Sequence, residues 1–187
     1  MSDDGKPLNE DDRTILGTSM PDVDFGFNTN FGYKNVDLMI FMRGVYGNKI
    51  ANARVQDLYS SNMIQWNMST EMMNRWTGPG TTNEYPRMHA SDPNQNIRFS
   101  DRYIENGSFL RISNIQIGYT LPRSLMSKLS ITRLRIYASV DNLHVFTTYR
   151  GFDPEMGDYQ GESLNAGVDM GAYPRPRTTT IGLNLTF

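Results

Sequence analysis

The sequence predicts an all-β fold in which five antiparallel strands cross a membrane as part of a β-barrel wall. The final residues, 178–187, alternate apolar and polar side chains and end on an aromatic residue. Segments 23–33 and 133–141 alternate in the same way. The connections between the five segments run short, long, short and long, which is typical of barrels with tight periplasmic turns and long extracellular loops.

Composition excludes several other classes of protein. The 187 residues are enough for one domain, and no run approaches the roughly 20 apolar residues of a membrane-spanning helix. The chain has no cysteine, which excludes a disulfide framework and thiol chemistry. Its formal charge is −2 and it carries no basic stripe, so no nucleic-acid partner is expected.

The first two strands are predicted at 22–33 and 36–47, joined by a two-residue turn at Lys34-Asn35. The first has an aromatic face opposite a face of glycine and asparagine, which suits lipid on one side and a wet lumen on the other. The second strand alternates less cleanly. The lipid-facing side chains expected here are Phe25, Phe27, Phe31 and Tyr33.

A long excursion is predicted for residues 47–107. Apolar side chains at helical spacing predict a short amphipathic helix from Val55 to Trp66. A second short helix is expected over 70–76, ended by the Gly-Pro-Gly run that follows Thr77. A connection of this length is ordinary for an extracellular loop of a barrel.

Three further strands are predicted at 108–121, 132–146 and 176–187. In the third strand the parity of the apolar residues changes near Ser113-Asn114, which predicts either a bulge or a crossing from the lumen-packed to the lipid-facing surface. Residues 122–131 are expected to form a turn region, and 148–174 a second long extracellular loop. The lipid-facing side chains expected on the last two strands are Ile136, Ala138 and Leu183.

The chain begins without a signal peptide, because residues 1–5 are polar and no apolar segment follows them. We therefore expect the chain to be the C-terminal piece of a longer precursor. Five strands do not close such a barrel, so we expect an open sheet with two unpaired edges.

No metal, cofactor or catalytic site is expected. The acidic lead-in does not match the spacing of a calcium-binding EF-hand around Gly5, and a solvated loop is the default interpretation of its residues Asp3, Asp4, Glu10, Asp11 and Asp12. His89 and His144 have no second ligand at metal spacing. No nucleophile elbow or glycine-rich phosphate loop is present, so we expect no enzyme.

Several segments resemble the SusC/RagA-type TonB-dependent outer-membrane receptors. The resemblance spans essentially the whole chain and is carried by Asp12–Gly17, Phe109–Asn114, Gly118–Pro122, Val140–Leu143 and Tyr173–Thr178. It implies a 22-stranded barrel in the cell outer membrane, of which these are the last five strands. The family's plug domain, N-terminal barrel strands and TonB box have no counterpart here.

The resemblance also implies a function and partners. Members of the family import glycans, oligosaccharides or peptides. A SusD-like surface lipoprotein acts as a lid, and TonB supplies energy through the N-terminal region. The aspartate-rich glycine loop that members of the family often carry before Asp-Arg-Thr is shortened here to Asp4-Gly5-Lys6-Pro7, which leaves its metal binding open.

Two sets of residues are candidate contact sites. Loop aromatic residues are candidates for stacking on sugar rings, although the favoured interpretation is that they pack the loops together or contact the lid; they are Trp66, Trp76, Tyr85, Tyr103, Tyr149 and Tyr159. The last strand resembles the signal that the outer-membrane assembly machinery recognises by pairing with a free strand edge. The residues of that signal are Thr180, Gly182, Leu185 and Phe187.

A secreted, soluble β-sandwich that binds carbohydrate is the alternative. The two hypotheses differ in where the apolar faces point. In a barrel wall, the faces that carry Phe25, Ile136 and Leu183 share one side of a single sheet. In a sandwich they converge into a core closed by a second sheet.

Overall fold

The structure, a computed structural model, describes residues 12–60, 67–126, 131–155 and 166–187. The chain divides into two compact units, each with its own sheet. The strand unit comprises Met20–Asn48, Gly107–Tyr149 and Tyr173–Phe187. The loop unit comprises Met1–Ser19, Lys49–Asn106 and Arg150–Ala172.

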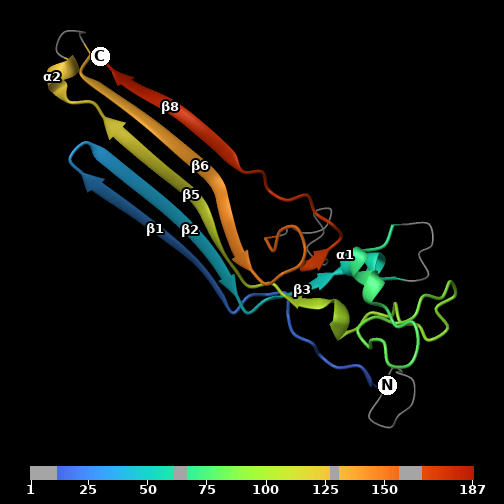
Figure 1. Ribbon diagram of the computed structural model, residues 1–187. Helices are drawn as coiled ribbons and strands as arrows, with labels where there is room; N and C mark the ends of the chain where they lie inside the picture. The colour runs from blue at the N-terminus through green and yellow to red at the C-terminus, as the bar shows by residue number, and fades with distance from the viewer. Residues whose placement is uncertain (1–11, 61–66, 127–130, 156–165) are drawn as a thin grey trace. The chain divides into compact units, whose positions relative to one another are not determined.

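The strand unit is one antiparallel sheet of five strands in the order β1-β2-β5-β6-β8 (Figure 1). Its strands are β1 (Val23–Tyr33), β2 (Val36–Tyr46), β5 (Phe109–Thr120), β6 (Arg133–Thr147) and β8 (Thr178–Thr186). The five predicted antiparallel strands are thus confirmed. Strands β1 and β8 form the two edges of this sheet within the described part of the chain.

The strand register gathers the apolar side chains on one face. Residues that lie directly opposite each other in neighbouring antiparallel strands point to the same side of the sheet. One such row crosses all five strands and is apolar throughout: Phe31, Leu38, Ile117, Ala138 and Ile181. The neighbouring row on this face consists of Tyr33, Val36, Tyr119, Ile136 and Leu183. We call this side the apolar face.

The opposite side, the polar face, carries mostly small and polar side chains, although Met39 and Phe41 of β2 also lie on it. One of its rows also crosses the whole sheet and alternates glycine with larger residues: Gly32, Asp37, Gly118, Tyr137 and Gly182. The next row consists of Asn30, Met39, Gln116, Ser139 and Thr180. A sheet with two such different faces has its register strongly specified, because a shift by one residue exchanges the faces.

Of the two alternatives predicted for the third strand, the structure shows the bulge. The pairing of β5 with β6 shifts between Ile112 and Asn114, and the pairing of β2 with β5 shifts at Phe41/Met42. Because the extra residue reverses the alternation, Ile112 and Ile115 lie on the same face despite their odd spacing. On β6 the irregularity includes Asn142, whose φ of 53° lies in the left-handed region.

The loop unit has a small sheet of its own, which the sequence analysis did not predict. Strand β3 (Lys49–Asn52) lies between β4 (Ile104–Asn106), with which it is antiparallel, and β7 (Val168–Asp169), with which it is parallel. Polar side chains link β3 to β4 and join Arg150 to β4. Asn52 donates to the Glu105 carboxylate over 3.0 Å, and Arg150 pairs with the same carboxylate at 3.1 Å.

The helices of the loop unit are shorter than predicted. Helix α1 (Ala53–Leu58) begins at Asn52, whose side chain caps it by accepting from the Val55 amide, and ends before residues 61–66, which lie outside the described residues. The helix predicted at 70–76 is the 3₁₀ helix η2 (Thr70–Asn74), and a further 3₁₀ helix, η3, covers Asp101–Tyr103. Within the described part of the chain, no helix is both long and apolar enough to cross a membrane.

A short helix also forms in the strand unit. Helix α2 (Arg123–Met126) lies in the connection between β5 and β6, where only a turn had been predicted. The turn between β1 and β2 is the predicted two-residue connection, and Lys34 in it has a φ of 54°. A left-handed residue at this place matches the twist of the two strands that it joins.

Candidate functional sites

The apolar face of the strand unit is exposed over much of its area. The exposed fractions are 44% for Phe25, 42% for Ile136 and 62% for Leu183. These residues lie on one face of one sheet, as do the other candidates for lipid contact, Phe27, Phe31, Tyr33 and Ala138. The geometry therefore presents them together on one surface, and their contact with lipid stays a prediction.

The polar face is linked by charged and amide side chains. Arg43 on β2 pairs with Asp24 on β1 at 2.9 Å. Asn114 on β5 donates to the Asp141 carboxylate on β6 over 2.6 Å. Such contacts satisfy polar groups across neighbouring strands, so this face suits contact with water rather than with acyl chains.

The residues of the candidate assembly signal lie at the end of the chain, on or after β8. Thr180 and Gly182 point to the polar face, whereas Leu185 points to the apolar face. Phe187 follows the strand and is 84% exposed. Since β8 is an edge of the described sheet, its outer backbone groups are available for pairing with another strand. Recognition by an assembly machinery stays a prediction.

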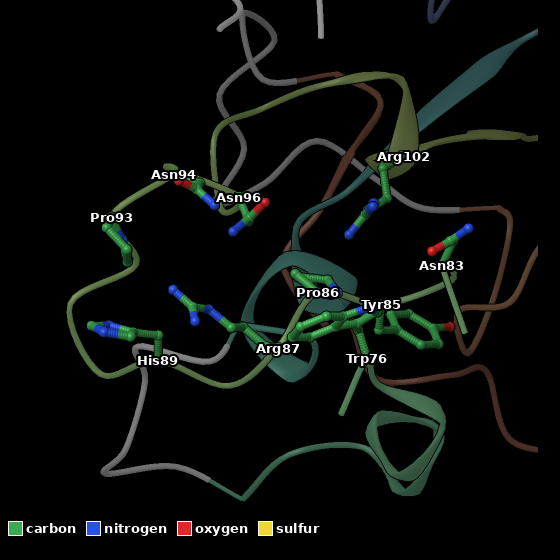
Figure 2. A pocket seen from close by; sticks show the side chains of 10 residues that line it. All are labelled: Trp76, Asn83, Tyr85, Pro86, Arg87, His89, Pro93, Asn94, Asn96 and Arg102. Carbon is green, nitrogen blue, oxygen red and sulfur yellow. The ribbon is translucent and has the colours of Figure 1, made fainter. Parts of the chain in front are cut away.

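The loop unit contains an open pocket with a volume of about 400 Å³. Figure 2 shows its lining, which combines aromatic, amide and cationic side chains. The lining residues are Trp76, Asn83, Tyr85, Pro86, Arg87, His89, Pro93, Asn94, Asn96 and Arg102. The volume lies within the range of roughly 300–1,000 Å³ that is usual for small-molecule sites.

A cluster of two tyrosines and a glutamate fixes the aromatic side of this pocket. The hydroxyl groups of Tyr59 and Tyr85 both donate to Oε2 of Glu71, over 2.6 and 2.8 Å. The two rings stack with their centroids 5.0 Å apart. The Tyr59 hydroxyl, and then that of Tyr85, holds the pKa of Glu71 below its usual value. Burial, followed by the bond to Glu71, raises the pKa of Tyr85.

A turn centred on Asp92 shapes the other side. Its carboxylate accepts from the Asn96 side chain over 2.9 Å and from the Ile97 amide over 3.0 Å. Burial acts to raise the pKa of Asp92, but these hydrogen bonds outweigh it and the pKa is lowered. The charged carboxylate thereby holds the turn that carries Asn94 and Asn96 to the pocket.

The six aromatic residues proposed as ligand contacts do not lie together in the structure. Trp76 and Tyr85 line the pocket. Tyr103 is only 2% exposed and its hydroxyl donates to the Asn96 carbonyl, while Tyr149, in the strand unit, is 6% exposed. In this structure these two rings are therefore not presented to a ligand. Trp66 and Tyr159 lie outside the described residues.

The structure adds pocket residues that the sequence analysis missed. Arg87 and Arg102 had no motif or spacing that marked them, and only the fold brings them to one pocket. Of the two histidines, His89 contacts the Ser91 hydroxyl at 2.9 Å and His144 meets the edge of Phe146. Among the described residues no three potential metal ligands gather. The acidic lead-in lies outside them except for Asp12.

Five antiparallel strands with one exposed apolar face and one polar face define a segment of a β-barrel wall. No family model matches the chain. Among curated relatives, the TonB-dependent receptor P3 of Formosa agariphila is 36% identical over 94% of this chain. The TonB-dependent receptor SusC of Bacteroides thetaiotaomicron is 28% identical over 96% of it.

Solved structures give the same result. The RagAB peptide importer in its open-open state matches 92% of the chain with a TM-score of 0.79 and 27% identity. The chain belongs to the SusC/RagA-type TonB-dependent receptors. It spans 17% of the P3 receptor, 16% of SusC and 18% of the matched RagAB chain.

Proposed function

We propose that this chain forms part of the wall of an outer-membrane nutrient importer, with its apolar face toward lipid and its polar face toward the lumen. The exposed apolar face, continuous over five strands, is the observation that carries the proposal. Exposure of apolar surface to water costs roughly 25 cal/mol per Å². Acyl chains remove this cost, which is why such a face suits a bilayer.

The relatives suggest which components of the intact system carry out passage, closure and energy supply. We assign substrate passage to a complete barrel, of which this sheet is one arc. A SusD-like lipoprotein would cover the extracellular side and TonB would supply energy, as the SusC and RagAB relatives suggest. The substrate class is a glycan, an oligosaccharide or a peptide. We assign no catalytic step to this chain.

A secreted β-sandwich that binds carbohydrate is the weaker alternative. A sandwich places the inner faces of its two sheets about 10 Å apart and fills the space between them with side chains. Here the residues that would fill it, such as Phe31, Ile136 and Leu183, are exposed. The apolar side chains therefore favour a lipid-facing wall.

Cell fractionation combined with gene deletion tests the proposal. The intact protein that contains this chain is expected in the outer-membrane fraction. Deletion of its gene is expected to abolish growth on one oligosaccharide or peptide source while growth on monomers is unchanged. Recovery as a soluble secreted protein, or unchanged growth of the deletion strain on every polymeric source tested, would contradict it.

A further inference from the structure

The loop-unit pocket carries positive charge without compensation from its own lining. Two of its ten described lining residues are arginines, Arg87 and Arg102, and none is an aspartate or glutamate. Figure 2 shows the two arginines on different segments of the unit, with Trp76 and Tyr85 also lining the pocket. The fold therefore brings together two cations that are 15 positions apart in the sequence.

These two arginines differ from other arginines of the unit. Arg75 donates to the Met72 carbonyl, Arg98 to the Gln95 side chain, and Arg150 pairs with Glu105. Neither Arg87 nor Arg102 makes a hydrogen bond or an ion pair with another residue in the described part of the chain. No described residue thus occupies either guanidinium group, and both arginines are exposed.

The aromatic part of the pocket wall is held by contacts within the loop unit. Tyr85 is 7% exposed, its hydroxyl donates to Glu71 and its ring stacks on Tyr59, so this residue is a fixed part of the pocket wall. The ring of Trp76, which is only partly buried, is the aromatic surface open to a ligand. The Trp76 amide donates to the Tyr85 carbonyl over 2.9 Å, which holds the two residues side by side. A flat ligand with an apolar face fits such a wall at little cost in side-chain entropy.

We infer that this pocket binds an acidic oligosaccharide, that is, one with carboxylate or sulfate groups on its sugar rings. Guanidinium groups bind carboxylates and other oxyanions through paired, charge-assisted hydrogen bonds. The amides of Asn83 and Asn94 offer donors and acceptors for sugar hydroxyl groups, and the ring of Trp76 matches the apolar face of a pyranose. This assignment rests on the proposed import function and narrows its substrate class.

The test compares pairs of ligands that share a sugar backbone and differ in whether their acidic groups are charged. The purified intact protein in detergent is titrated calorimetrically with a galacturonate tetramer and with its methyl-esterified form. A sulfated galactose tetramer and its desulfated form make a second pair, which separates carboxylate from sulfate as the source of the charge. We expect the charged member of at least one pair to bind about tenfold more tightly, with an affinity that falls as salt is raised.

Single substitutions test whether the preference for the charged ligand arises in this pocket. Arg87→Gln and Arg102→Gln are each expected to weaken binding of the charged ligand about tenfold and to leave the neutral form unaffected. Arg98→Gln is the matched control, because Arg98 is an exposed arginine of the same unit that does not line the pocket. It is expected to retain wild-type affinity. Arg87→Lys keeps the charge and is expected to restore part of the loss.

Several results would overturn the assignment. These are equal affinity for charged and neutral forms, an equal loss in the Arg98 control, and tighter, arginine-dependent binding of an acidic peptide such as pentaglutamate. The protein could also lie in the outer membrane and support uptake but bind neither charged saccharide. That result would overturn this inference and leave the proposed function standing. Loss of the outer-membrane location itself contradicts the proposed function.

Discussion

Arg135 on β6 reaches across Gly118 on β5 to Asp37 on β2, and its Nε donates to Oδ1 of Asp37 over 2.9 Å. A Cβ atom on Gly118 would overlap the Arg135 guanidinium, so the missing side chain of this glycine makes room for the contact. The pair therefore links two strands that are not neighbours in the sheet. Asp37 and Gly118 lie in the same row as Tyr137, over whose ring the guanidinium also lies.

Substitution of Gly118 by alanine is expected to displace Arg135 and break its pairing with Asp37. The loss is expected to be about 1–2 kcal/mol, because the pair is partly exposed but doubly hydrogen bonded. Gly32→Ala is the matched control in the same row, since its Cβ would meet no atom within 4 Å. Heat-induced unfolding of the intact protein in detergent measures the stability of both variants. Equal stability of the two variants would argue against a role for the arginine.

Asn142 combines a left-handed backbone with two side-chain hydrogen bonds at the β6 irregularity. Its Oδ1 accepts from Arg111, and its Nδ2 donates to the Arg175 carbonyl over 2.6 Å. Asn142→Val is expected to cost about 3 kcal/mol, because it loses both bonds and forces a β-branched residue to positive φ. Asn142→Gly keeps the backbone and is expected to cost about 1 kcal/mol. Unfolding of the intact protein in urea distinguishes them, and equal costs would contradict a backbone contribution.

The loop unit is expected to loosen in acid through Glu71. The folded state holds the pKa of Glu71 below its unfolded value, so the carboxylate contributes stability above that unfolded value of about 4.3. The contribution is lost as the pH falls through the lowered pKa. Hydrogen exchange of residues 69–76, corrected for intrinsic rates, should therefore accelerate below pH of about 4. Glu71→Gln should remove this acceleration, and its persistence in that variant would assign it to another group.

Adjacent residues of β1 test which face meets lipid. Phe27 points to the apolar face and Asn28 to the polar face, and both side chains are exposed. Phe27→Lys is expected to cost about 2–4 kcal/mol if it places a charge among acyl chains, whereas Asn28→Lys should cost less than about 1 kcal/mol. The amount of folded intact protein in the outer membrane gives the comparison. A larger loss for Asn28→Lys would reverse the assignment of faces.

The five strands were predictable because their alternation is a local property of the sequence. A strand with one apolar face displays its period over ten or more residues, as the segment that became β1 does. The bulge of β5 was predictable for the same reason, since Leu110 and Ile112 break the parity of Ile115 and Ile117.

The small sheet of the loop unit was not predictable in this way. Strand β7 has two residues, too few to show a period, and it pairs with Ala51 and Asn52 more than one hundred positions earlier. The α1 prediction was too long because apolar spacing alone does not mark where a helix ends. For the pocket, the sequence supplied Trp76 and Tyr85 as candidates, but isolated loop arginines such as Arg87 and Arg102 carry no periodic signal.

The polar-face row in which glycines alternate with larger residues also affects how thick this part of a barrel wall is. Arg135 lies over Gly118, and the ring of Tyr137 lies over Gly182, so both long side chains run along the sheet instead of standing up from it. In a closed barrel the clear diameter at any height depends on how far the inner side chains project. At Gly118 and Gly182 the inner surface of this arc is therefore formed by the flattened side chains of Arg135 and Tyr137, and a bulkier residue at either glycine would lift those side chains and narrow the bore.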